Sequence, residues 1–142
     1  MPDRPDDEAD SDGVEEAITT RIEELHSRVQ RDLEQFEPPE NPPDEARAME
    51  YLREGAGQAV ALYAHARTGG RMYAFDPEEY ERLEEAMNAW FGMYGACYGV
   101  DIEPNIPLRT AAQALIDTND ITAVARTVTT IPPRENPTEH SR

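Results

Sequence analysis

The sequence predicts an all-α protein: a single compact bundle of four to five helices, with a long N-terminal amphipathic helix and disordered termini. Apolar residues recur every three or four positions over long stretches, as on one face of an α-helix. Prolines cluster between these stretches and near both ends. The length of 142 residues suits one domain. We expect a disordered acidic tail over 1–13, a helical domain over 14–131 and a disordered polar tail over 132–142.

The first helix is expected to begin at Val14, after a segment rich in acidic residues, proline and glycine. The opposite face of this helix is charged, so its apolar stripe must be covered by something. Packing within the same domain is the first interpretation. A dimer seam through Ile18, Ile22, Leu25 and Val29 is the alternative. The stripe, with steps of three and four, consists of Val14, Ile18, Ile22, Leu25, Val29, Leu33 and Phe36.

The second helix follows a stiff connector with four prolines between positions 38 and 43, which we interpret as a structural elbow. Asp44 is expected to cap this helix, and a pair of glycines to close it after Thr68. Gly55 and Gly57 are unfavourable inside a helix. They indicate tight packing, a bend or a ligand close to the backbone, and we expect tight packing.

The third helix has a strong start signal at Asp76-Pro77, where a capping residue precedes a proline and two glutamates. Its first half carries charged residues on the back. Its second half, from Ala89 to Val100, has none. A helix without charge on any face must be nearly buried, so this segment is expected to form the centre of the core.

Two short helices complete the predicted domain, one over about 107–117 and one over about 120–129, joined by a turn at Thr118-Asn119-Asp120. Their apolar spacing partly matches a DNA-binding helix-turn-helix over 108–129. However, Leu115 occupies the position where the tight turn usually requires glycine. Arg126 is the one clear candidate for a phosphate contact, which is little for a mode of binding dominated by phosphate attraction.

The chain carries 30 acidic and 13 basic residues, a net charge of −17, and every basic residue is arginine. This balance predicts adaptation to a cytoplasm at multimolar salt, because carboxylates hold water and cations and arginine still pairs with them. At about 1 M salt the Debye length is only about 3 Å, so self-repulsion costs little. A DNA mimic is the alternative, but the densest acidic run lies in the predicted tail. No stretch is apolar enough for a membrane span or a secretory signal, so we expect a cytoplasmic protein without a membrane partner.

Candidates for chemistry are few. The single cysteine, Cys97, excludes an internal disulfide and any zinc site that needs two cysteines. His26 and His65 form no closely spaced pair, and we expect no metal, no cofactor and no catalytic residue. A Cys97–His65 dyad is the sharpest alternative, but Cys97 lies on the apolar stripe of the third helix, where a core thiol is the normal expectation. An enzyme is therefore not expected.

Most aromatic residues lie between positions 63 and 98, and core packing is their expected role. Tyrosine and tryptophan need partners for their polar atoms, so a groove or a shared interface is the alternative. Cations and hydroxyl groups beside the rings would suit an anionic or aromatic ligand. Such a ligand or interface site would consist of Arg67, Arg71, Tyr73, Trp90 and Tyr94.

Three segments resemble small haloarchaeal proteins of a helical family with no assigned function. The resemblance covers roughly Leu33 to Ile131 and implies a single helical domain from a halophile. It implies no activity, cofactor or catalytic residue. The segments are Phe36-Glu37-Pro38-Pro39-Glu40-Asn41-Pro42-Pro43, Arg67-Thr68-Gly69-Gly70 and Ala96-Cys97-Tyr98-Gly99-Val100.

These patterns together predict a non-enzymatic helical interaction module, which acts as a homodimer or as an adaptor to another protein. The long striped first helix and the lack of a recognisable catalytic set favour this interpretation. Two alternatives stay open at this point. One is a DNA-binding regulator that uses residues 108–129, and the other is a small-molecule sensor or enzyme at the Tyr/Trp/Arg group.

Overall fold

The computed structural model describes the backbone of residues 6–68 and 75–129, and the side chains of 15–66 and 75–129. Within these residues, all regular secondary structure is helical, which confirms the predicted all-α fold. Three consecutive elements join end to end, so the described helices number five, as predicted. The joined elements are α2 (Glu45–Glu50), the π-helix η1 (Tyr51–Ala56) and α3 (Gly57–Thr68).

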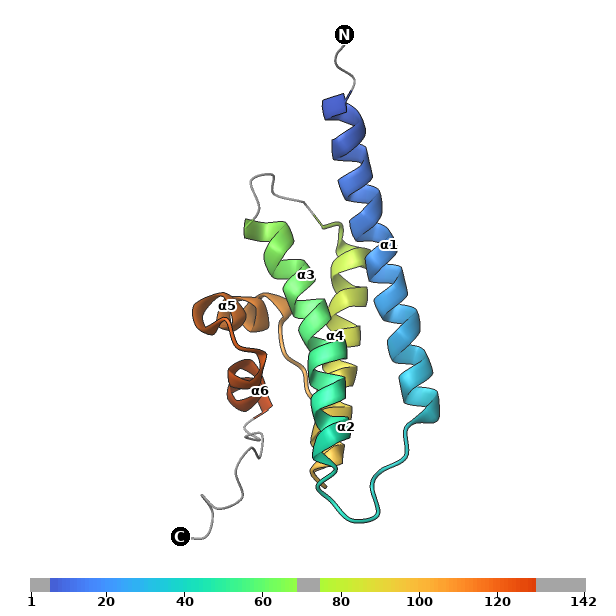
Figure 1. Ribbon diagram of the computed structural model, residues 1–142, viewed down its shortest axis with the longest axis vertical. Helices are drawn as coiled ribbons and strands as arrows, with labels where there is room; N and C mark the ends of the chain where they lie inside the picture. Colours follow the sequence, from blue (N-terminus) through green and yellow to red (C-terminus); the bar gives the residue numbers. More distant parts are fainter. Residues whose placement is uncertain (1–5, 69–74, 130–142) are drawn as a thin grey trace.

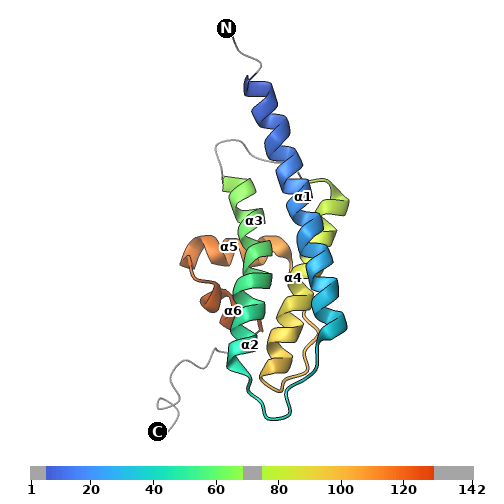
Figure 2. The same cartoon turned by 45° about the vertical axis from the view of Figure 1, so that its right-hand side comes forward.

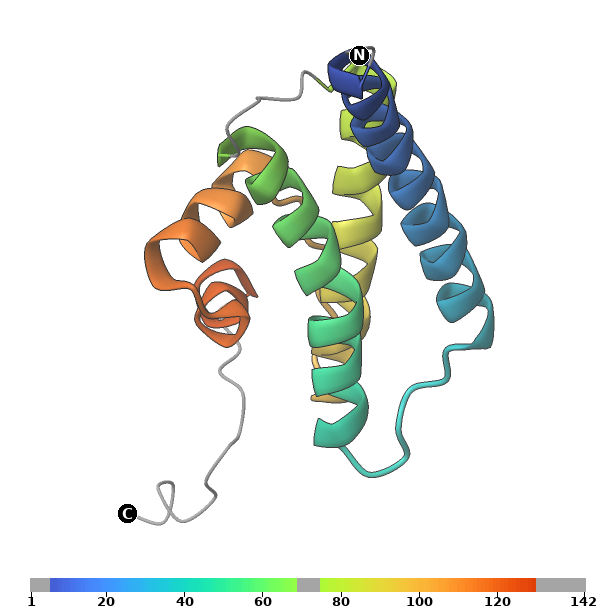
Figure 3. The same cartoon turned by 45° about the horizontal axis from the view of Figure 1, so that its top comes forward.

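The central helix of the bundle is α4 (Pro77–Cys97). On one side α4 packs along α1 (Asp6–Gln35), and on the other it packs against η1 and α3 (Figures 1 and 3). Two short helices lie on the side away from α1: α5 (Leu108–Thr118) packs on α3, and α6 (Ile121–Thr129) packs on α5 and η1. The prediction that the third helix forms the centre of the core is confirmed for the large side chains of its uncharged second half, because Trp90, Phe91 and Tyr94 are fully buried.

The first helix begins earlier than predicted, at Asp6 instead of Val14. Its N-terminal turns extend beyond the other helices (Figures 1 and 2). Acidic residues at a helix N-terminus are stabilised by the helix dipole, so the acidic composition of 6–13 is compatible with a helix as well as with a solvated tail. The helix start predicted at Val14 is therefore wrong, whereas the domain boundary predicted at residue 13 stays a prediction. The predicted tail over 132–142 and residues 1–5 lie outside the described residues.

The apolar stripe of α1 is covered within the same chain. Ile18, Ile22, Leu25 and Val29 are all buried in the core formed with the other helices. Two hydrogen bonds tie α1 to α4: Thr19 Oγ1 donates to Glu79 at 2.8 Å, and Trp90 Nε1 donates to Asp32 at 2.9 Å. The alternative of a dimer seam through these four residues is thus wrong, because α4 already occupies the face that a second copy would need.

The proline-rich connector is held as an elbow by Arg47. The guanidinium group of Arg47 lies 5.1 Å from the ring centroid of Phe36 and donates a hydrogen bond to the carbonyl of Glu37 at 2.8 Å. Asp44 caps α2 as predicted and accepts a hydrogen bond from the backbone N–H of Arg47. The backbone N–H of Asp44 in turn donates to the carbonyl of Cys97 at 2.8 Å, which joins the start of α2 to the end of α4.

The predicted tight packing at Gly55 is confirmed. A Cβ atom at this position would lie 2.5 Å from the indole ring of Trp90. The π-helix at this point was not predicted, because its wider turn leaves no mark in the spacing of apolar residues. Gly57 is also close-packed, since a Cβ atom there would lie 2.9 Å from the carbonyl oxygen of Leu52.

The ends of the last three helices follow local rules. Asp76 and Glu79 form a capping box at the start of α4. Gly99, with a φ of 80°, ends α4 before the predicted Val100, and the N–H of Val100 bonds the carbonyl of Gly95. Asn119, with a φ of 54°, ends α5 in the same left-handed conformation. The two short helices lie within about two residues of their predicted bounds.

Candidate functional site

The aromatic residues proposed for a ligand site lie in the core where they are described. Trp90 and Tyr94 are both completely buried. The ring of Trp90 packs on Gly55, and its N–H is bonded to Asp32. Burial raises the pKa of the Tyr94 hydroxyl. Neither side chain reaches a surface from which it could take a ligand.

Three other members of that proposed site cannot be placed beside them. Arg71 and Tyr73 lie outside the described residues, as does the side chain of Arg67. Among the described aromatic residues, Tyr63 packs against Phe75 and Tyr80. The ring of Tyr63 lies 5.1 Å from that of Phe75 and 5.6 Å from that of Tyr80.

Cys97 and His65 lie at opposite ends of the bundle. The carbonyl of Cys97 accepts a hydrogen bond from Asp44, at the start of α2. His65 lies near the far end of α3, and α2, η1 and most of α3 separate it from that start (Figure 1). Burial raises the pKa of the Cys97 thiol to about 11. The thiol is thus protonated at neutral pH and has no histidine base beside it, so a catalytic dyad is excluded.

The described part of the chain contains neither a metal-binding cluster nor a membrane-spanning helix. No group of three or more histidine, cysteine, aspartate or glutamate side chains is arranged to hold a metal ion there. Likewise, none of the described helices is long and apolar enough to cross a bilayer.

Arg126, the proposed DNA contact, is exposed on α6. Asp117, in the last turn of α5, and Asp120, directly before α6, are both exposed. Hydrogen bonds from Thr122 lower the pKa of Asp120, which keeps this carboxylate charged. The charged Asp120 interacts electrostatically with Arg126 and would repel a phosphate backbone that approaches this arginine. The helix-turn-helix alternative stays a prediction, and the charges around Arg126 do not support it.

A shallow apolar hollow of about 330 Å³ lies on the outer face of α4, between the end of α1 and the connector that follows α4. Its floor is made of three small residues, Ala89, Gly92 and Ala96, and Leu33 lies at its edge with 44% of its surface exposed. Leu33 belongs to the α1 stripe, of which Ile18, Ile22, Leu25 and Val29 are buried. The hollow is lined by Leu33, Phe36, Asn88, Ala89, Gly92, Met93, Ala96, Ile102 and Pro104.

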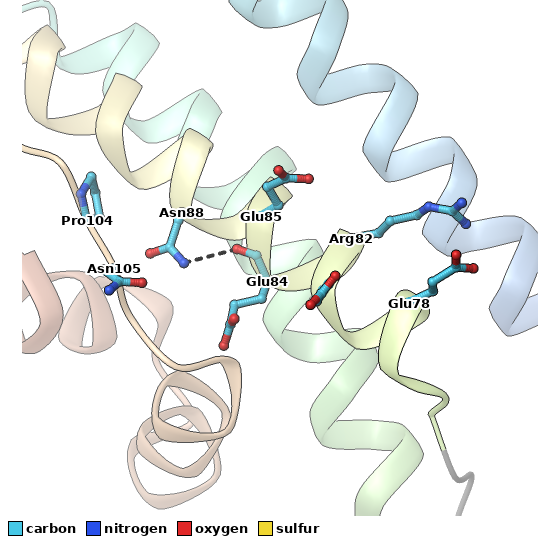
Figure 4. A pocket seen from close by; sticks show the side chains of 8 residues that line it. Glu78, Arg82, Glu84, Glu85, Asn88, Pro104 and Asn105 are labelled. Atoms are coloured by element: carbon cyan, nitrogen blue, oxygen red, sulfur yellow. Dashed lines mark hydrogen bonds between the residues drawn. The ribbon is translucent and has the colours of Figure 1, made fainter.

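A second hollow, of about 510 Å³, adjoins the first and is acidic (Figure 4). Asn88 and Pro104 line both hollows, which therefore meet at these two residues, and we call the two hollows together the α4 groove. Its acidic end faces the N-terminal half of α4 and its apolar end the C-terminal half. The acidic end is lined by Glu78, Glu81, Arg82, Glu84, Glu85, Asn88, Pro104 and Asn105.

Asn88 fixes one wall of the groove. Its amide oxygen accepts a hydrogen bond from the N–H of Ile106 at 2.9 Å, and its amide nitrogen donates to the carbonyls of Ile106 and Glu84, both at 3.1 Å. Figure 4 shows Asn88 facing the connector, with its bond to Glu84 as a dashed line. The carboxylate of Glu84 accepts the N–H of Leu108 at 2.8 Å and thereby caps α5, whose own first position is preceded by a proline.

The sequence indicates parts of this groove separately. Charged residues are expected on the back of the third helix, and residues 101–107 fall between two expected helices. One signal was present: Glu78, Glu81, Glu85, Asn88, Gly92 and Ala96 follow one another at steps of three and four and thus share one face of α4. The spacing of these residues does not indicate that the connector after α4 folds back along this face.

One family model matches the chain, over residues 16–133, and is described as a domain of unknown function, DUF8055. No curated protein and no solved structure matches. The matched residues include every residue of the α4 groove. The expectation of a family without an assigned function is confirmed to this extent. The chain belongs to the DUF8055 family.

Proposed function

We propose that this protein is a non-enzymatic docking module and that a helix of a partner protein binds in the α4 groove. The observation that carries the proposal is the exposure of Leu33 at the edge of a groove whose floor is formed by Ala89, Gly92 and Ala96. An apolar side chain beside small residues favours helix packing, because small residues let a second helix approach closely.

The size of the groove fits a helix. From Glu78 to Ala96, its floor extends over about 27 Å at the ordinary helical rise of about 1.5 Å per residue. Recognition of an amphipathic helix in such a groove is a recurrent mode of peptide binding. The inert Cys97 thiol and the lack of a described metal cluster offer no support for an enzyme.

The proposal also includes the setting. We propose a cytoplasm at multimolar salt, of the kind found in haloarchaea. The support comes from the net charge of −17 and from the exclusive use of arginine as the basic residue. Under these conditions hydrophobic contacts carry most of the binding, since charges are screened beyond about 3 Å at about 1 M salt.

Site-directed crosslinking tests the proposal. A photoreactive residue is placed at Leu33 in the full chain, and a matched control carries it at Ile116, which is equally exposed at 47% but lies on α5 outside the groove. Irradiation in extracts of the source organism, in about 2 M salt, should give a defined adduct from position 33 only. Mass spectrometry should map the adduct to one predicted helix of one partner.

The purified partner then allows a direct measurement. Light scattering should detect a complex with the wild type and with Ile116→Glu, but not with Leu33→Glu. A crosslink between position 33 and a second copy would show a homodimer through the groove instead. Equal adducts from both positions, or a complex unaffected by Leu33→Glu, would contradict the proposal.

A further inference from the structure

We infer that the helix taken by the α4 groove is cationic and amphipathic, with apolar side chains over the Leu33 end and arginine or lysine side chains over the glutamate end. The inference rests on the proposed docking function and adds the chemistry of the partner. It is carried by the juxtaposition of an apolar and an acidic hollow along a single helix face.

The charge at the acidic end faces outward. Two glutamates of this part of α4 serve the fold itself: Glu79 accepts bonds from Thr19 and Asp76, and Glu84 caps α5. Glu78, Glu81 and Glu85 are exposed, and Arg82 is the single cation among the lining residues. A partner helix along this end thus meets a surplus of negative charge. Cationic side chains would complement it.

The opposite end excludes charge. Between Ala89 and Ala96 the helix face carries no ionisable side chain, and the walls are Leu33, Phe36 and Ile102. A charged side chain of the partner would lose its hydration here without gaining a counter-charge. Apolar side chains would gain from burial against this surface.

The positions of the two ends set a register for the partner. Gly92, in the apolar floor, is about 10 Å from Glu85 and about 16 Å from Glu81 along α4, at about 1.5 Å per residue. A helical partner should therefore carry its cations about two to three turns from its apolar anchors. A second copy of this chain would bring the same glutamates to the same place, which disfavours self-association through the groove at low salt.

Three synthetic helical peptides, each about 20 residues long, test the inference on the full chain. The first has leucines at one end and arginines two to three turns away. The second has glutamates in place of the arginines, and the third has serines in place of the leucines. Affinity is measured by fluorescence anisotropy at about 0.2 M and about 2 M salt. The first peptide should bind at least about tenfold more tightly than the second at the lower salt, and more tightly than the third at both salts.

Charge-swap variants locate the effect. The pair Glu81→Arg and Glu85→Arg should abolish the preference for the arginine peptide and favour the glutamate peptide. The matched control is Glu50→Arg with Glu54→Arg, an exposed pair with the same spacing on the second helix, which changes the net charge equally and should leave the preference intact. Circular dichroism confirms folding of both, since Glu85 also lies 3.4 Å from His26.

The possible failures can be told apart. Equal binding of the arginine and glutamate peptides would overturn the cationic partner but leave the docking function standing. An equal response of the two charge-swap pairs would show a general effect of net charge and would also overturn it. Absence of binding by the arginine peptide refutes the inference as well, whereas the docking function itself is judged by the crosslinks from Leu33.

Discussion

Gly55 has no side chain because the indole ring of Trp90 occupies the space that a Cβ atom would need, at 2.5 Å. Two closely packed helices can cross at such a point only if one of them lacks a side chain there. The Trp90 ring is also held from the other side, by the hydrogen bond of its N–H to Asp32 of α1. One ring thus joins three helices.

We predict that Gly55→Ala lowers the free energy of unfolding by about 1–3 kcal/mol, because the rigid ring cannot yield without moving the backbone. Gly92→Ala is the control: its Cβ atom would have no neighbour closer than 3.6 Å, and alanine favours a helix by up to about 1 kcal/mol. Urea unfolding, followed by Trp90 fluorescence, measures both. Equal stability of the two variants would contradict the packing at Gly55.

Cys97 offers a second test at the scale of a residue. Its thiol is fully buried and burial raises its pKa to about 11, so we predict that a thiol reagent labels the native protein far more slowly than the unfolded chain. The folded-state pKa exceeds the unfolded value of 9.0. Protonation of this thiol therefore stabilises the fold below pH 9, and the contribution falls as the pH rises toward 11. Rapid labelling at pH 8 without denaturant would refute the buried position.

At the scale of elements, the connector after α4 is held by Asn88 in the way that a neighbouring strand would hold it. The side-chain amide pairs with both the N–H and the carbonyl of Ile106. Since Glu84 then caps α5, one turn of α4 positions both the wall of the groove and the start of the next helix. The α4 groove depends on this arrangement.

We predict that Asn88→Ala lowers the free energy of unfolding by about 1–3 kcal/mol, because the polar groups of Ile106 lose their partners. Amide hydrogen exchange should accelerate at Ile106 and Leu108 while α1 and α4 keep their protection. Asn105→Ala, an exposed position in the same hollow, should change neither quantity. Unchanged exchange at Ile106 in Asn88→Ala would show that the connector is held by something else.

The short helices and the elbow show which elements could be predicted from local signals. Asp44, Asp76 and Pro107 mark helix starts that the structure confirms, because a cap acts on the residues next to it. The early start of α1 and the π-helix were missed. Acidic composition does not separate a helix N-terminus from a tail, and a π-turn preserves the apolar character of the helix.

At the scale of the whole molecule, 30 carboxylates on a 142-residue chain repel one another at low ionic strength. We predict that the thermal midpoint rises as salt is increased from about 0.1 M to about 2 M, because screening removes the repulsion. Calorimetry measures it. The thermal midpoint of the Glu50→Arg/Glu54→Arg variant, whose net charge is less negative by four, should rise less with added salt. A midpoint independent of salt would argue against adaptation to high salt.

The sequence by itself determined the helical class, the positions of most helix starts and the burial of the stripes on α1 and α4, because periodicity and caps act over a few neighbouring residues. Only the tertiary structure decided what covers each stripe. The apolar stripe of α1 packs against α4 and not against a second copy of the chain. The connector at Pro104 lies along one face of α4 and forms a wall of the groove there. Such pairings join residues far apart in the chain, and no local pattern specifies which apolar faces will meet.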